Sequence, residues 1–492
     1  MSAAATDVTY EMVVGLEVHV QLKTRTKLFC GCPTDFGAPP NSHVCPVCLG
    51  LPGVLPVLNR EAFGLALRAA LALGADVAPF TKFDRKNYYY PDLPKNYQIS
   101  QYDLPFSRGG RVAFDRDGRL VEIRVHRVHL EEDAGKLLHA GTLDPGGALV
   151  SVAGGSLVDL NRTGIPLLEI VSEPDIRSAE EAHGYLTALK QILQYADVSD
   201  CDMEKGSLRC DANVSVRPAG EPRLGVKVEI KNLNSFRFVA RALDCEARRQ
   251  IGILRDGGRI VQETRLWDSE REETRPMRSK EEAHDYRYFP EPDLVPVVVT
   301  PAWLEAVRKT LPEMPRARRE RFVSRYGLPG YDAEVLTQTR DLADFFEACV
   351  AASASPKAAS NWIMGELSKL VNERKCDVAH SGITPEGLAE LIRLVEAGTI
   401  TGTAAKEVFA GMAATGKPPG EIVRERGLTA VTDAGEIEVL CRAALDANPG
   451  PVADYRGGKK AALQFLVGCV MKASRGKAGA KAVSETLVRL LS

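Results

Sequence analysis

The chain has 492 residues, enough for about three domains, and its 45% apolar content can fill ordinary buried cores. A net charge of −2 does not suggest a protein that coats nucleic acid non-specifically, so any RNA contact requires a local basic patch. Residues 1–10 lack the features of a secretory signal, and no apolar run reaches the roughly 18 residues of a membrane span. We therefore expect a soluble, cytoplasmic protein.

Strand patterns dominate the first part of the chain. Residues 12–22 alternate between apolar and polar or small side chains, which predicts a half-buried strand with Glu17 and His19 on its polar face. The same alternation recurs in residues 207–217 and 226–231. Strands with one apolar and one charged face favour an antiparallel sheet that is open on one side.

Four cysteines in two close pairs follow the first strand: Cys30 with Cys32, and Cys45 with Cys48. Two such knuckles of soft thiolate ligands suit tetrahedral zinc, and the lack of a fifth ligand favours a closed structural site. The alternatives to a four-cysteine zinc site are four ordinary thiols without a metal, or a metal site in which His43 competes as a ligand. The other seven cysteines are scattered along the chain, which favours a reducing compartment.

Acidic side chains on the predicted strands suggest a second metal site. One further strand begins with the alternation of residues 121–125 and runs into residues 130–136, which are rich in acids. Carboxylates with one imidazole suit Mg²⁺, which would in turn hold ATP phosphates, whereas a solvated charged face is the alternative. Lys227 and Lys231 flank Glu229 and could either neutralise phosphate oxygens or form ordinary salt bridges. The candidate ligands are Glu17, His19, Glu132, Asp211 and Glu229.

Composition divides the chain into three parts. Residues 1–297 are rich in strands and end in a stiff proline-rich segment, and residues 298–415 have helical periodicity almost throughout. Residues 416–492 begin with a Gly/Pro-rich break and predict a small helical domain. We therefore expect an α+β chain, with an N-terminal domain on an antiparallel sheet, a helical domain and a helical tail.

Two segments could contact nucleic acid. Residues 88–97 form an aromatic, proline-rich loop that could stack on a base, although a packed loop is nearly as plausible. Residues 456–481 carry seven basic side chains and no acidic one, which favours contact with a phosphate backbone over plain solvated surface. The candidate RNA contacts there are Lys459, Lys460, Lys472, Arg475 and Lys477.

The order of these motifs resembles the GatB family, the B subunits of the aspartyl/glutamyl-tRNA(Asn/Gln) amidotransferases. The chain has no P-loop, which rules out a standard P-loop nucleotide site. It also has no Gly-x-Ser-x-Gly elbow, no amidase-type serine loop and no N-terminal cysteine, so we do not expect it to generate its own ammonia. The resemblance covers essentially the whole chain. Its motifs are residues 14–22, the cysteine knuckles, and residues 88–97, 129–136, 159–170, 209–213, 229–235 and 286–294.

The resemblance implies a cradle-shaped N-terminal domain in which ATP phosphorylates the carboxylate of a misacylated tRNA. Ammonia from a glutaminase, the A subunit, then displaces the phosphate to give Gln-tRNA(Gln), Asn-tRNA(Asn) or both, and a small C subunit completes a heterotrimer. The tail is similar to YqeY proteins, which implies that it grips the tRNA. The implied magnesium ligands are Glu17, His19, Glu132, Asp211 and Glu229. The last three of these are also the implied catalytic residues, and Glu131 and Asp133 would orient the ligands. The implied nucleotide-binding residues are Lys227, Lys231 and Arg162.

Two rival functions stay open at this point. One is a zinc-containing, tRNA-binding scaffold without chemistry of its own, which would bind tRNA without ATP or magnesium. Carboxylates that face a cavity would repel phosphates unless a cation lies among them, which counts against this scaffold. The other is the archaeal-type sister subunit, which works with an asparaginase-like partner. Such sister subunits carry an extra inserted domain, and a chain of 492 residues leaves little room for one.

Overall fold

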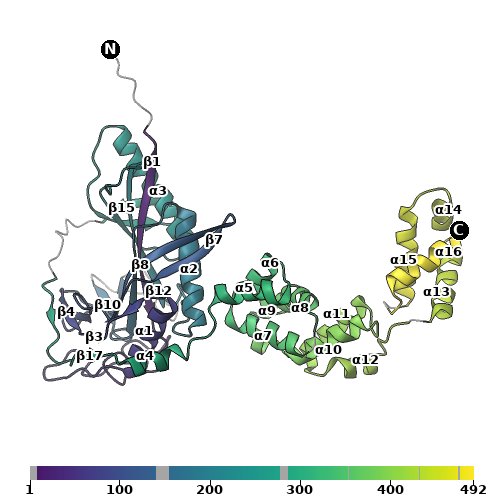
Figure 1. The fold of residues 1–492 in the computed structure, drawn as a ribbon, viewed down its shortest axis with the longest axis horizontal. Coiled ribbons are helices and arrows are strands. Elements are labelled where there is room, and N and C mark those ends of the chain that lie inside the picture. The colour runs from purple at the N-terminus through teal and green to yellow at the C-terminus, as the bar shows by residue number, and fades with distance from the viewer. Residues whose placement is uncertain are drawn as a thin grey trace, which may run out of the picture. The chain divides into compact units, whose positions relative to one another are not determined.

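The computed structural model describes residues 8–139, 155–277, 286–352, 354–431, 433–474 and 477–491. The chain forms two compact units, Met1–Met314 and Pro315–Ser492. The first unit is rich in strands and the second is helical (Figure 1), which confirms the predicted α+β class. Within the ranges given above, no helix combines the length and apolar character that a membrane span requires.

A mostly antiparallel sheet forms the centre of the first unit. Its central strand β1 (Tyr10–Gln21) lies between β11 (Pro166–Ser172) and β12 (Leu208–Pro218) and pairs antiparallel with both. Next to these strands lie β8 (Arg119–Glu132) and β13 (Val228–Lys231). Beyond β13, one edge is formed by β14 (Thr264–Asp268), which is parallel to β13, and then by β15 (Glu273–Pro276). Beyond β8, the other edge is formed by β6 (Ser107–Arg108) and then β2 (Asp76–Val77), and β7 (Arg111–Arg116) also pairs with β8.

Short strands outside this sheet complete the β-structure of the first unit. They form one three-stranded and two two-stranded sheets. These strands are β3 (Phe80–Thr81), β4 (Asp84–Asn87), β5 (Tyr97–Ser100), β9 (Lys136–His139), β10 (Ser156–Asp159), β16 (Phe289–Pro290) and β17 (Val297–Val298).

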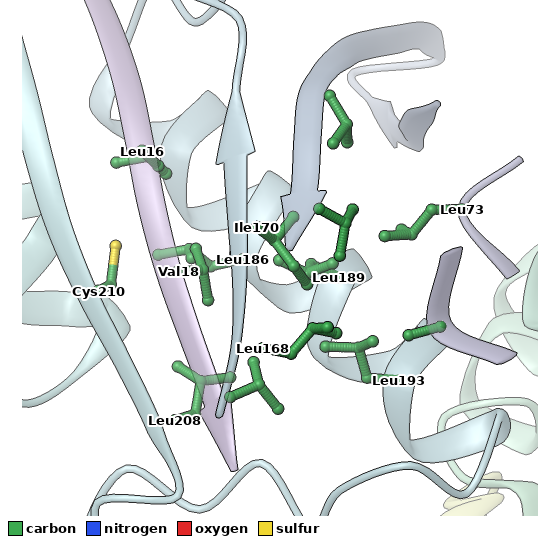
Figure 2. Close-up of a cluster of buried hydrophobic side chains, with 14 of the residues drawn as sticks. Leu16, Val18, Leu73, Leu168, Ile170, Leu186, Leu189, Leu193, Leu208 and Cys210 are labelled. Carbon is green, nitrogen blue, oxygen red and sulfur yellow. The ribbon is translucent and has the colours of Figure 1, made fainter. Parts of the chain in front are cut away.

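Two long helices, α2 (Ala179–Tyr195) and α3 (Phe236–Arg255), contribute to the core on the apolar face of the sheet. Figure 2 shows Val18 of β1 and Ile170 of β11 among the leucines of α2, all fully buried. Each such side chain contributes roughly 1.5–3 kcal/mol on burial. Because side chains alternate along a strand, this packing directs Glu17 and His19 to the opposite face.

The first unit extends beyond the boundary predicted at residue 297. Helix α4 (Pro301–Arg308) follows that boundary, and its Trp303 lies against Phe63 of α1 (Arg60–Ala72) with ring centroids 5.5 Å apart. Trp303 and Leu304 thereby pack on the first core. This packing explains why the unit ends after α4 rather than before it.

The second unit contains two separate hydrophobic cores. The second predicted boundary, at residue 416, falls inside the first of them, because Ile422 and Val423 pack there. That core uses α5 (Pro315–Tyr326), α6 (Gly330–Leu336), α7 (Arg340–Ala351), α8 (Pro356–Trp362), a π-helix (Ile363–Leu367), α9 (Ser368–Arg374), a 3-10 turn (Val378–His380), α10 (Pro385–Glu396), α11 (Gly402–Thr415) and α12 (Pro419–Arg426). The other uses α13 (Ala434–Asp446), α14 (Pro449–Arg456), α15 (Ala461–Ala473) and α16 (Ala480–Leu491).

Candidate active site

Strand pairing aligns a row of polar side chains across the open face of the sheet. His19 of β1 is opposite Arg209 of β12 on one side and Glu169 of β11 on the other, and Glu169 is opposite His129 of β8. Paired residues project to the same face, so these four side chains lie together. The Nε2 atoms of both histidines lie 3.4 Å from Oε2 of Glu169.

A second row follows two residues earlier along β1. Glu17 is opposite Asp211. One row further, Asn213 is opposite Gly15 on one side and Glu229 of β13 on the other, and its Nδ2 donates to Oε1 of Glu17 over 3.0 Å. Nζ of Lys231 lies 3.7 Å from Oδ2 of Asp211 and 3.4 Å from Oε1 of Glu229. The predicted alternation therefore does bring Glu17, Asp211 and Glu229 to one face.

These rows line a cavity of about 450 Å³, here called the acidic cavity. Aromatic side chains from two distant segments also line it: Tyr88 and Tyr102 from one, and Tyr286 and Tyr288 from the other. The rings of Tyr102 and Tyr288 stack with centroids 4.0 Å apart, and Nζ of Lys86 lies 4.9 Å from the centroid of Tyr286. The aromatic loop singled out in the sequence thus contributes Tyr88 to this cavity.

Burial and mutual repulsion make this a site that favours a cation. Burial raises the pKa of Glu17, and the nearby charges of Glu169 and Glu229 raise it further. Burial likewise raises the pKa of Asp211. For His19, burial lowers the pKa, but the hydrogen bond and charge of Glu169 outweigh it and the net pKa is raised. A divalent cation among these groups would remove the repulsion between the carboxylates.

Three side chains of the acidic cavity come close enough together to bind one metal ion. The ligand atoms of His19, Glu131 and Glu169 all lie within 4.8 Å of one another. Glu131 and Glu169 are buried, and both also contact His129. Burial lowers the pKa of His129, but the two carboxylates raise it to about 9, so that His129 supplies a positive charge.

The structure contradicts the predicted place of Glu132 in this group. Glu132 lies on the other side of β8, where its Oε1 contacts Nζ of Lys95 and accepts from the backbone N–H of Ile99 over 2.9 Å. It lines a separate cavity of about 200 Å³ beside Cys48, and Glu131 lines the acidic cavity instead.

A β-bulge in β8 explains why Glu131, rather than Glu132, lines the acidic cavity. The register between β11 and β8 shifts at Val171 and Ser172, where an extra residue of β8 lies between Val125 and Arg127. Such a bulge reverses which face the following side chains occupy. An alternation extrapolated from residues 121–125 therefore assigns Glu131 and Glu132 to the wrong faces.

The three predicted nucleotide-binding residues have different surroundings. Lys231 and Arg162 line the acidic cavity, whereas Lys227 lines a neighbouring one. The guanidinium of Arg162 donates to the backbone carbonyls of Ala134 and Gly135 over 2.9 and 2.7 Å, so it also orders that segment. Lys227 is exposed and forms no ion pair with any described residue.

Glu169, Arg209 and His129 were missing from the predicted site. Glu169 is 8% exposed and is the one charged residue of β11, and a lone charge in a mostly apolar strand is the signal that could have found it. Arg209 was on the polar face already recognised in residues 207–217, and its Nη2 lies 2.9 Å from Oδ1 of Asp133. Their contribution depends on pairing between strands distant in the sequence.

The four cysteines of the knuckles converge as predicted. Their sulfurs lie within 4.8 Å of one another, and the sulfurs of Cys45 and Cys48 are 3.9 Å apart. Tetrahedral zinc with Zn–S bonds of about 2.3 Å needs sulfurs about 3.8 Å apart. A hydrogen bond shared with Cys30 and the nearby charge of Lys27 lower the pKa of Cys48 to about 4.

The surroundings of the knuckles also fit a metal. The ammonium of Lys27 is fully buried, lies 3.7 Å from Sγ of Cys48 and donates to the carbonyl of His43 over 2.7 Å. It offsets part of the negative charge that four thiolates would carry. His43 is not a member of the converging group of ligands. The cluster could therefore hold a metal such as zinc.

The basic segment of the tail is largely accessible. Lys459, Lys460 and Lys472 are exposed, whereas Lys477 is half-buried. Nζ of Lys459 lies 3.1 Å from Oδ1 of Asp454, which neutralises part of the patch. Arg475, the remaining candidate, lies outside the described residues.

Comparison with known proteins identifies the family. A model described as the GatB/GatE catalytic domain matches residues 12–305, and one described as the GatB domain matches residues 344–491. The chain belongs to the GatB family, the B subunits of the aspartyl/glutamyl-tRNA(Asn/Gln) amidotransferases. The first model spans nearly the whole sheet, including both rows of the acidic cavity.

Individual relatives agree over nearly the full length. The aspartyl/glutamyl-tRNA(Asn/Gln) amidotransferase B subunit of Carboxydothermus hydrogenoformans is 57% identical over 97% of this chain and 98% of the relative. The B subunits of a Thermoanaerobacter species and of Geobacter sulfurreducens are 55% and 54% identical, each over 98% of this chain and 99% of the relative. This coverage leaves no inserted domain of the kind expected for the archaeal-type sister subunit.

Proposed function

We propose that the chain uses ATP to activate the side-chain carboxylate of Glu-tRNA(Gln), Asp-tRNA(Asn) or both, and then forms the amide. It would act in a heterotrimer with a glutaminase, the A subunit, which supplies ammonia, and with a small C subunit. The observation that carries this proposal is the acidic cavity, where buried carboxylates and basic side chains converge on one face of the sheet. Membership of the GatB family supports the same reaction.

The residues present fit Mg²⁺ together with the phosphates of ATP. Carboxylate oxygens are the ligands that Mg²⁺ prefers. The pKa of Glu17 is raised by burial and then by the charges of Glu169 and Glu229, and a cation would relieve that repulsion. When bound, Mg²⁺ would align the phosphates and offset their charge. The residues that would hold it are His19, Glu131 and Glu169, whose ligand atoms lie within 4.8 Å of one another, with Glu17, Asp211 and Glu229 as further acids of the same cavity.

The basic side chains would position the reacting groups. Lys231 and Arg209 line the cavity beside these acids and would bind phosphate oxygens and the substrate carboxylate. An oxygen of that carboxylate attacks the γ-phosphorus, the bond to the bridging oxygen breaks, and ADP leaves. Ammonia then attacks the acyl carbon, inorganic phosphate leaves, and loss of a proton gives the amide.

Amidation by the reconstituted heterotrimer tests this function. With Glu-tRNA(Gln), ATP and glutamine, Glu131→Gln should reduce amide formation at least about 100-fold while glutamine hydrolysis persists. Glu122→Gln, an exposed carboxylate on the same strand β8, is the matched control and should keep full activity. Unchanged amidation by Glu131→Gln would exclude the acidic cavity as the reaction site.

The knuckles and the tail would have supporting roles in the same cytoplasmic enzyme. Cys30, Cys32, Cys45 and Cys48 would hold a structural zinc ion. Lys459, Lys460, Lys472, Arg475 and Lys477 would contact the tRNA. The alternative, a scaffold that binds tRNA without chemistry, rests on these two features alone and leaves the buried acids without a purpose.

A further inference from the structure

The stretch between the two cysteine pairs is held in place by a segment far away in the sequence. Residues 38–43, here called the knuckle loop, form an irregular loop in this stretch. Asn41 of the loop has a backbone φ of 57°, in the left-handed region that asparagine tolerates. Its side chain donates to the carbonyl of Val158 over 3.0 Å and accepts from the N–H of Leu160 over 2.8 Å. The knuckle loop is therefore fixed against residues 158–161.

Asn161 holds the same loop with both ends of its side-chain amide. Its Oδ1 accepts from the backbone N–H of His43 over 2.8 Å, and its Nδ2 donates to the carbonyl of Pro39 over 2.7 Å. The backbone groups of an irregular loop are not paired in a strand ladder, so side-chain amides satisfy them instead. One asparagine thus bridges two distant points of the knuckle loop.

A buried lysine connects this contact directly to the cysteines. The ammonium of Lys27 lies 3.7 Å from Sγ of Cys48. It also donates to the carbonyl of His43 over 2.7 Å and to that of Leu160 over 3.4 Å. The knuckles, the knuckle loop and residues 158–161 therefore form one hydrogen-bonded group, in which the charged donor makes the stronger kind of bond.

The same segment continues into the wall of the acidic cavity. Arg162 follows Asn161 and lines that cavity, and its Nε lies 3.6 Å from Oδ2 of Asp133. Two residues further, the N–H of Gly164 donates to the carbonyl of Asp133 over 2.8 Å. This segment thus contacts the knuckle loop at one end and the acidic cavity at the other.

We propose that Asn161 is a positioning residue that couples the cysteine knuckles to Arg162 and to nucleotide binding in the acidic cavity. This inference rests on the proposed function and gives the knuckles a part in it. When Cys32 and Cys45 hold a metal, both ends of the stretch that contains the knuckle loop are fixed, so the partners of Asn161 stay in place. If either the metal or the amide is removed, ordering the loop costs more conformational entropy, and the backbone that carries Arg162 loses its anchor.

A double-mutant cycle in the reconstituted heterotrimer tests this coupling. Asn161→Ala removes the amide, Cys48→Ser disrupts the metal site, and a double variant combines them. For each protein, kcat and the KM for ATP are measured in the amidation of Glu-tRNA(Gln), and the zinc content of the purified chain is measured separately. Asn372→Ala, at an exposed asparagine of α9 in the second unit, is the control. Should Asn161→Ala fail to fold, Asn161→Asp, which keeps an acceptor for the N–H of His43, takes its place.

Asn161→Ala should raise the KM for ATP about tenfold while the zinc content stays that of the wild type, and Cys48→Ser should raise the KM by a similar factor. The double variant should raise the KM no further than either single variant, because both changes break the same connection. The control should match the wild type in all three measurements.

An unchanged KM in either single variant would overturn the inference, as would factors that multiply to about 100-fold in the double variant. So would a fall in kcat alone, which indicates lost folded protein rather than a misplaced Arg162. Loss of zinc from Asn161→Ala would also overturn it, because Asn161 would then only support the metal site. If the wild type shows no ATP-dependent amidation, the proposed function itself fails.

Discussion

At the scale of single residues, the face that a side chain occupies decides its chemistry. The sequence correctly predicted Glu17, Asp211 and Glu229 on one polar face, because alternation along a regular strand is local. It exchanged Glu131 and Glu132, because the bulge in β8 depends on pairing with β11 and leaves no local signal. Glu169 was missed for a related reason, since its partners His19 and His129 are distant in the sequence.

The cysteine cluster gives a prediction at this scale. Cys48→Ser removes the most buried of the four sulfurs, so the zinc content of the purified chain should fall from about one ion to near zero. Loss of a structural metal should also lower the free energy of unfolding by at least about 2 kcal/mol. Metal analysis and thermal denaturation measure both effects. Cys245→Ser, outside the cluster, is the control, and full zinc content in Cys48→Ser would contradict a four-cysteine site.

At the scale of elements, paired charges add to the aromatic contacts that hold helices α5 and α7 together, such as Phe322 against Phe346. In the second unit, Arg318 and Arg321 of α5 each donate to Glu347 of α7 over 2.6 Å, and the hydroxyl of Tyr326 donates over 3.0 Å. Burial raises the pKa of Glu347, but these hydrogen bonds outweigh it and lower the pKa from 4.5 to about 2. Ionised Glu347 therefore stabilises the contact between α5 and α7.

This lowered pKa predicts how the stability of the second unit depends on pH. A carboxyl whose pKa is lower in the folded state stabilises the fold above its unfolded pKa, and this contribution disappears as the pH falls from about 4.5 to about 2. Glu347→Gln should cost about 1–2 kcal/mol at pH 7, because the group is partly exposed and screened. Urea denaturation at pH 7 and pH 3 tests this. An equal difference between wild type and variant at both pH values would contradict the assignment.

At the scale of the whole molecule, the order of a sheet-rich part, a helical part and a helical tail was predictable from composition and periodicity. The boundaries between these parts were less predictable, because α4 and α12 join their hydrophobic cores through contacts with helices that precede them. Hydrophobic periodicity indicates that a helix exists but does not identify the core it joins. The GatB family then accounts for the parts together, as a catalytic domain over residues 12–305 followed by a helical domain over residues 344–491.

The tail gives a prediction for the complete chain. Lys460→Ala with Lys472→Ala removes two exposed ammonium groups that have no ion pair among the described residues, so tRNA affinity should fall by roughly tenfold. The slope of the logarithm of the binding constant against the logarithm of the salt concentration should become shallower by about two. Filter binding at several salt concentrations measures both. Lys369→Ala, an exposed lysine of α9 that already pairs with Glu373, is the control. Equal affinity and slope in the double variant would exclude this patch from the tRNA contact.

The most direct test of the central claim traps the activated carboxylate. The wild-type heterotrimer is mixed with Glu-tRNA(Gln), ATP and Mg²⁺ without glutamine, and hydroxylamine is added as the nucleophile. The account predicts a γ-glutamyl hydroxamate and one ADP per trapped carboxylate in the wild type and in Glu122→Gln, and neither product in Glu131→Gln. Hydroxamate formed with AMP instead of ADP, or formed equally well by Glu131→Gln, would contradict phosphorylation in the acidic cavity.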